Sequence, residues 1–219
     1  NRKTKKVDKE YIKSNNNIDN FLEKNSNLIV IFHQRWSLRF SETFFDNNEG
    51  YKEEHNLKYH SYLEPVNIKT YSQKERENYI IEGLKSQIES IINQGHKLIL
   101  VYPVPEMGFN VPYLFKKNFY KERSFLNYSI PILSSSYEVY KKRNRLIFEV
   151  LDGIDNSNIY RVYPDRLFCN TDIINRCVAN NKDSIFYFDD DHLSVQASKF
   201  VVDEIMNQIG NIKLKTQEK

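Results

Sequence analysis

The chain has 219 residues, of which 40% are hydrophobic and 28% are charged, and its formal net charge is +3. These values are ordinary for a soluble globular protein of one domain that is long enough to bury a substantial core. No apolar run approaches the roughly 18 residues of a membrane span, and no signal-peptide pattern is present. The basic ends lack interleaved aromatic residues, so we interpret them as solvated tails and expect no nucleic-acid binding.

The first half of the chain alternates helical and strand patterns. Residues 7–23 form a weak helical pattern, and residues 28–32 are a continuous apolar run, typical of a strand buried on both faces of a parallel sheet. Ser72 and Glu75 form a capping box that begins an amphipathic helix, which Gly95 closes. A second buried strand follows immediately at 97–102, and residues 41–70 are interpreted as a long surface excursion.

The second half repeats the same cycle. Ser135 and Glu138 suggest another capping box, for a helix that ends at Gly153, and residues 159–163 predict a third strand. A strand-like run at 185–188 precedes a final helix, expected to end at Gly210. Strands that alternate with helices of this length predict right-handed βαβ crossovers and a parallel sheet sandwiched by helices. We therefore predict one α/β domain over residues 1–219, with an ordered core over about 20–210.

Polar clusters follow three of the apolar runs, at residues 33–36, 103–106 and 189–192. In a parallel sheet, chemistry gathers at the carboxyl ends of the strands. Asp189 lies three residues before His192, so its carboxylate is expected to hydrogen-bond Nδ1 of the imidazole, as in a Ser-His-Asp site, with Nε2 facing a cleft. The alternatives are a solvated loop of three aspartates and a divalent-cation site. The EF-hand spacing is absent, and we expect no metal.

The two cysteines, Cys169 and Cys177, lie eight residues apart in a loop-like stretch. A metal site would need further Cys or His ligands nearby, and a thioredoxin-like pair would be closer in sequence. The spacing suits a disulfide, which would imply an oxidising compartment. Two buried free thiols are the alternative.

Four segments in order resemble the C-terminal SGNH domain that is fused to membrane acyltransferases, which O-acetylate bacterial surface polysaccharides. They are residues 28–37, ending in Arg-Trp; 95–112, with Pro-x-Pro-Glu; 163–177, with the two cysteines; and 187–198, with Asp-x-x-His-Leu-Ser. The resemblance implies a three-layer αβα, SGNH-hydrolase-like (flavodoxin-like) fold in which Asp189 and His192 are catalytic. It also favours the Cys169–Cys177 disulfide, because the family's domain lies in the periplasm.

The family's Gly-Asp-Ser block, whose Ser is the nucleophile, does not occur in this sequence. Because the chain also begins with Asn rather than Met, we interpret it as a fragment that lacks its first strand or strands and is inactive alone. Arg35 and Trp36, after the first apolar run, are candidates for the oxyanion, acyl or sugar site. The structural alternative is that Trp36 packs beneath the sheet edge while Arg35 pairs with a carboxylate, and Glu106 has the same two interpretations.

The implied reaction is O-acyl transfer, expected to be acetyl transfer, to a cell-surface polysaccharide such as O-antigen or capsule. The implied partners are this acceptor and an N-terminal transmembrane acyltransferase domain of the same protein, with acetyl-CoA as the ultimate acetyl donor and no cofactor bound by this domain. The implied location is periplasmic. The alternatives are an SGNH esterase that hydrolyses acetyl esters and a catalytically inactive polysaccharide-binding module.

Overall fold

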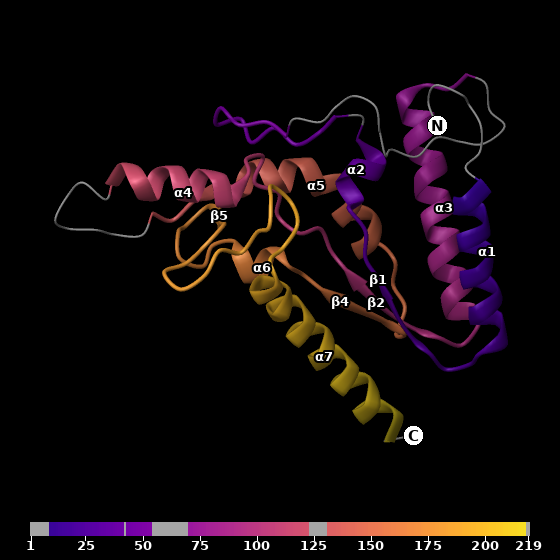
Figure 1. The fold of residues 1–219 in the computed structure, drawn as a ribbon. Helices are drawn as coiled ribbons and strands as arrows, with labels where there is room; N and C mark the ends of the chain where they lie inside the picture. Colours follow the sequence, from indigo (N-terminus) through magenta and orange to yellow (C-terminus); the bar gives the residue numbers. More distant parts are fainter. Residues whose placement is uncertain (1–8, 42, 54–69, 123–130, 218–219) are drawn as a thin grey trace.

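A parallel three-stranded sheet forms the centre of the computed structural model (Figure 1). The structure describes residues 9–41, 43–53, 70–122 and 131–217. The strand order is β1 (Ile29–Phe32), β2 (Lys97–Val101) and β4 (Ile159–Val162), and β2 pairs with both neighbours. The three apolar runs expected to be strands therefore lie in one parallel sheet, and the predicted α/β class is confirmed.

Helices cover both faces of this sheet. Because side chains alternate along a strand, Leu98 and Leu100 of β2 face one side and Ile99 and Val101 the other. The first pair shares a core with α1 (Lys9–Lys24), α3 (Gln73–Asn93) and α5 (Tyr137–Asp152), and the second shares a core with α7 (Val195–Gln217). Figure 1 shows α1 and α3 side by side on one side of the sheet, with α7 on the other. None of the helices in the described ranges is long and apolar enough to cross a membrane.

Shorter elements complete the domain at the carboxyl end of the sheet. These elements are α2 (Trp36–Phe40), α4 (Val111–Glu122), β3 (Ser134–Ser136), α6 (Asp165–Phe168) and β5 (Arg176–Val178). Strands β3 and β5 pair with each other in a two-stranded antiparallel sheet.

Of the two predicted capping boxes, the structure contains the first. The Ser72 hydroxyl accepts from Glu75 N at 3.3 Å, and Ser72 N donates to Glu75 Oε2 at 2.7 Å. The second box is wrong, because the N-cap of α5 is Ser136, which accepts from Val139 N. Ser135 lies in β3 instead, where its buried hydroxyl donates to the backbone oxygen of Glu106 at 3.2 Å. Pairing of β3 with β5 therefore moves the start of the helix by one residue.

Three other expectations about the elements differ from the structure. In the run 185–188, Ile185 and Tyr187 form isolated bridges rather than a strand, because no regular strand among the described residues lies alongside the run. Helix α7 continues past Gly210, since Ile212 on its next turn packs in the core. Strand β1 is not buried on both faces: Ile31 is 50% exposed, and β1 pairs only with β2 among the described residues.

A disulfide joins Cys169, at the end of α6, to Cys177 in β5. Both residues lie in the core, beside Val178 and Phe168. The predicted disulfide is confirmed, and the alternative of two free thiols is excluded.

Removing this disulfide by the double substitution of Cys169 and Cys177 to Ala is expected to lower the free energy of unfolding by about 2.5 kcal/mol, because the bond restricts the unfolded chain. Denaturant titration of the two proteins measures the difference. Thiol titration of denatured, non-reduced protein from an oxidising compartment should find no free thiol. Two titratable thiols would contradict the assignment.

Candidate functional site

The three polar clusters expected at the ends of apolar runs meet at the carboxyl end of the sheet. The loop between β2 and α4 holds the 189–192 loop through its backbone: Met107 N donates to Asp190 O at 2.8 Å, and Val111 N donates to Asp189 O at 3.0 Å. The buried Tyr187 hydroxyl donates to Pro105 O at 2.7 Å. The loop that carries His192 is therefore fixed to the core although it follows no regular strand.

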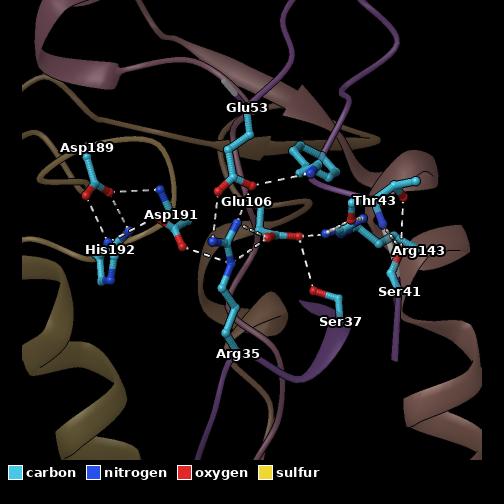
Figure 2. A network of polar contacts seen from close by, with 11 residues as sticks. Arg35, Ser37, Ser41, Thr43, Glu53, Glu106, Arg143, Asp189, Asp191 and His192 are labelled. Atoms are coloured by element: carbon cyan, nitrogen blue, oxygen red, sulfur yellow. Dashed lines mark hydrogen bonds and ion pairs between the residues drawn. The ribbon is translucent and has the colours of Figure 1, made fainter. Parts of the chain in front are cut away.

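Asp189 and His192 form the hydrogen bond expected from their spacing. Nδ1 of His192 lies 2.8 Å from Asp189 Oδ2 (Figure 2). The other carboxylate oxygen, Oδ1, accepts from the backbone N–H of Asp191 at 3.0 Å and of His192 at 2.8 Å. A carboxylate at Nδ1 holds the proton of the neutral imidazole on that nitrogen, so the lone pair lies on Nε2, where a general base needs it.

Among the residues that the structure describes, Nε2 of His192 faces solvent rather than either of the two hollows given below. The side chain of His192 is 73% exposed, and Nε2 has no hydrogen-bond partner among the residues that the structure describes. Two hollows lie elsewhere, one between α6 and α7 beside Phe200 and the other against α7 beside Tyr160. The described chain thus presents a base and its carboxylate without an enclosed site around them.

Asp191, to which the sequence assigned no role, is a second carboxylate at the same imidazole. Its Oδ1 lies 3.0 Å from Nδ1 of His192, and its Oδ2 lies 2.9 Å from Nε of Arg35. Its side chain is only 8% exposed. Asp191 therefore bridges the exposed histidine to the half-buried Arg35.

Arg35 lies at the centre of a buried charge network (Figure 2). Its guanidinium pairs with both oxygens of Glu53, including Nη1 to Oε1 at 2.8 Å. It also donates to Glu106 Oε1, from Nη2 at 2.6 Å and from Nε at 2.9 Å. The second oxygen of Glu106 accepts from Arg143 Nε at 2.6 Å and from Ser37 Oγ at 3.3 Å. The network ties together four segments that are distant in sequence.

The structure places Trp36 in the core rather than at a substrate site. The residue is fully buried, its Nε1 donates to Val101 O at 2.8 Å, and its ring packs edge-on against Phe32. The packing of Trp36 is that of the structural alternative, and a role for it at an acyl or sugar site stays a prediction. The same alternative holds for Arg35 and Glu106, which pair with each other.

Sequence reasoning missed Glu53 and Arg143. Glu53 lies in the stretch interpreted as a surface excursion, yet its residue is 4% exposed, and the nearby Phe45 is 1% exposed. No local pattern distinguishes Glu53 from the other acidic residues of the chain. Residues 54–69, which include His55 and His60, lie outside the described part.

The two carboxylates set the protonation of the site. Partial burial alone would lower the pKa of His192, but Asp191 and Asp189 outweigh it and raise that pKa above 6.5. Burial also raises the pKa of Asp191, to about 6, against the lowering effect of Arg35 and His192. For Asp189, the effect of burial is outweighed by the backbone N–H groups of Asp191 and His192 and by the imidazole, and its pKa is lowered. Both carboxylates are therefore ionised at pH 7.

Ligand atoms of Asp189, Asp191 and His192 lie within 4.8 Å of one another, close enough to surround a cation. Nδ1 of His192 and both aspartates are already engaged with one another, however, and Asp191 also pairs with Arg35. A cation would have to displace the contact that orients the imidazole. That this domain holds no metal stays a prediction.

We expect an NMR titration of the chain to show His192 titrating above 6.5, with the assignment made from a His192→Gln variant. Because the pKa is raised in the folded state, the stabilisation that it reflects is fully present below pH 6.5. It is lost as the pH rises through the folded-state pKa. A midpoint at or below 6.5 would contradict the two-carboxylate environment.

The comparisons with known proteins agree with this fold. The family model described as "SGNH domain (fused to AT3 domains)" matches residues 1–207. Among solved structures, the chain is similar to the periplasmic domain of a lipopolysaccharide acetyltransferase from Salmonella ser. Paratyphi A, with a TM-score of 0.51 and 16% sequence identity. That similarity covers 89% of this chain but only 61% of the solved one, and at this identity it shows the fold alone. No curated protein matches the chain.

Proposed function

Because the chain belongs to the family of SGNH domains that are fused to AT3 domains, we propose that it forms part of an O-acyltransferase, with His192 as general base and Asp189 as its orienting carboxylate. The observation that carries this proposal is the 2.8 Å contact between Asp189 Oδ2 and Nδ1 of His192, which leaves Nε2 open to solvent. The alternative of a purely solvated loop is disfavoured, since backbone hydrogen bonds fix the loop to the core.

We place the nucleophilic serine outside these 219 residues, since they contain no Gly-Asp-Ser block. Among the residues that the structure describes, β1 pairs only with β2, and this supports the placement because an edge strand can accept a further strand. Arg35, three residues after β1, contacts Asp191, which in turn contacts His192. A parallel strand added to this edge would end on the same side of the sheet as the imidazole.

The proposed reaction has two half-reactions. Nε2 of His192 takes the serine proton as Oγ attacks the carbonyl carbon of the acetyl donor, and the imidazolium returns that proton to the leaving group as the acyl-enzyme forms. Nε2 then takes the proton of a sugar hydroxyl, whose oxygen attacks the acyl-enzyme. Release of the serine, which recovers the proton from His192, leaves an acetyl ester on the sugar. Asp189 stabilises the imidazolium in both halves.

The proposed acceptor is a cell-surface polysaccharide, and the solved structure with the similar fold supports this, since it comes from a lipopolysaccharide acetyltransferase. The family description supports an acyltransferase domain as the covalent partner, which would deliver the acetyl group, ultimately from acetyl-CoA. We propose that no cofactor is bound by this domain. The Cys169–Cys177 disulfide supports a periplasmic location, because such bonds persist in oxidising compartments.

A serine-directed phosphonate and an activated acetyl ester test the proposal. The 219-residue chain should be neither labelled nor active, whereas a form extended to include a Gly-Asp-Ser block should be labelled at that serine and hydrolyse the ester. Transfer of acetyl to a polysaccharide by the extended form distinguishes a transferase from an esterase, which would pass the group only to water. Stoichiometric labelling of the short chain at another serine would refute the placement of the nucleophile.

A further inference from the structure

We propose that Asp191 is a positioning residue for His192, a second carboxylate that Arg35 clamps to the core so that it orients the imidazole and stabilises its protonated form. The part of this inference that concerns catalysis rests on the proposed function. The part that concerns the imidazole itself can be tested on the chain alone.

The exposure of His192 creates the need for such a residue. With 73% of the side chain exposed, little packing restrains the ring, so its orientation depends on the groups at Nδ1. Asp189 lies on the same short loop, and its side chain is 29% exposed. Asp191 is 8% exposed, and its second oxygen contacts Arg35, which belongs to a different segment of the chain. The side chain of Asp191 therefore links the ring to Arg35, outside the loop, whereas the side chain of Asp189 contacts Asp191 and His192 of its own loop.

Arg35 is itself held firmly enough to act as a clamp. Glu53 and Glu106 both accept hydrogen bonds from its guanidinium, and their side chains are only 1% and 6% exposed. Glu106 is fixed in turn by Arg143 from α5, which also donates to the backbone oxygen of Thr43. The position of Asp191 is thus set by contacts from residues 43–53, the β2–α4 loop and α5. A planar guanidinium with several fixed partners restrains the position of a carboxylate more than the single ammonium group of a lysine would.

The charges around the site favour the imidazolium. Two arginines, Arg35 and Arg143, face four carboxylates in the network, from Glu53, Glu106, Asp189 and Asp191. Asp190 adds a further acidic group, whose pKa is raised by burial and by the charges of Glu53 and Asp189 and lowered by Arg35. The cluster therefore has an excess of negative charge, which protonation of His192 reduces. Asp191 contributes to the raised pKa of His192, and Arg35 opposes it.

The experiment compares Asp191→Asn with Asp190→Asn in the full 219-residue chain by NMR titration of His192. Asparagine keeps the size of the side chain and an oxygen that can accept from Arg35, but it removes the charge beside Nδ1. We expect Asp191→Asn to move the His192 midpoint to lower pH and to increase the mobility of the ring. Asp190→Asn is the matched control in the same loop and should change both much less. Equal midpoints for Asp191→Asn and the unmodified chain would overturn the proposal.

A measurement on the unmodified chain keeps the proposal testable if Asp191→Asn does not fold. The carboxyl carbon resonance of Asp191 should shift as His192 titrates, and a resonance that stays flat through that titration would overturn the inference. In the serine-containing form, Asp191→Asn should lower kcat about tenfold or more with little change in KM, a typical effect of losing a group that assists proton transfer. It should also move the acidic limb of the pH–rate profile to lower pH, and Asp191→Glu should restore part of both.

These readouts separate the two proposals. If the unmodified serine-containing form transfers no acyl group while the His192 midpoint still depends on Asp191, the proposed function fails and the positioning contact stands. If the serine-containing form is active and Asp191→Asn changes neither the midpoint nor the pH–rate profile, the positioning role fails and the proposed function stands.

Discussion

Replacing His192 with alanine in a serine-containing form of the protein is expected to lower the rate of acyl transfer by a factor of roughly 10⁴ to 10⁶, as for the loss of a triad histidine elsewhere. The physical reason is that, under the proposed function, the serine proton goes to Nε2 of His192, which has no hydrogen-bond partner among the described residues and belongs to the ring that Asp189 orients. Initial rates with an activated acetyl ester, at enzyme concentrations high enough to see residual turnover, measure the loss.

Stability measurements provide the control for this variant. Because the side chain of His192 is 73% exposed, alanine should change the free energy of unfolding by no more than about 0.5 kcal/mol, the usual range for a surface substitution. A large loss of rate with unchanged stability therefore reports on chemistry rather than on folding. A loss of less than tenfold would contradict the role of His192 as general base.

Replacing Glu106 with alanine is expected to lower the free energy of unfolding by about 3–5 kcal/mol, the range found when one partner of a buried ion pair is removed. Glu106 is 4% exposed and accepts from Arg35, Arg143 and Ser37, so its removal leaves two guanidinium groups short of a partner in a largely buried place. Denaturant-induced unfolding measures the change.

The matched control is Glu138→Ala, which removes a glutamate that also forms an ion pair. Its partner is Lys141, three residues away on α5, and both side chains are largely exposed. An exposed pair of this kind contributes about 0–1 kcal/mol. Losses of similar size in the two variants would show that the network around Arg35 is effectively solvated, and the clamp on Asp191 would lose its physical basis.

The features that the sequence predicted correctly depend on neighbours along the chain or on burial. The three apolar runs form the parallel sheet, because continuous hydrophobic runs of this length are typical of strands in a sheet covered by helices, although β1 is less buried than this pattern predicts. The hydrogen bond between Asp189 and His192 spans three residues, and the capping box of Ser72 and Glu75 spans the same number. In the hydrogen bond and the capping box the partner is close in sequence, so the pattern of residue types is enough to identify it.

The tertiary structure decided everything that depends on distant partners. Arg35 pairs with Glu106, which is 71 residues away, and with Glu53, and no local pattern marks either glutamate as its partner. The run at 185–188 is apolar enough for a strand, but within the described part of the chain it forms only isolated bridges, because strand formation requires a neighbour that the folded chain supplies. The sequence does not distinguish Asp191 from the two neighbouring aspartates of its loop, whereas in the folded chain its side chain contacts Arg35. Local sequence determined which carboxylate hydrogen-bonds the histidine, and long-range packing decided which one ties it to the core.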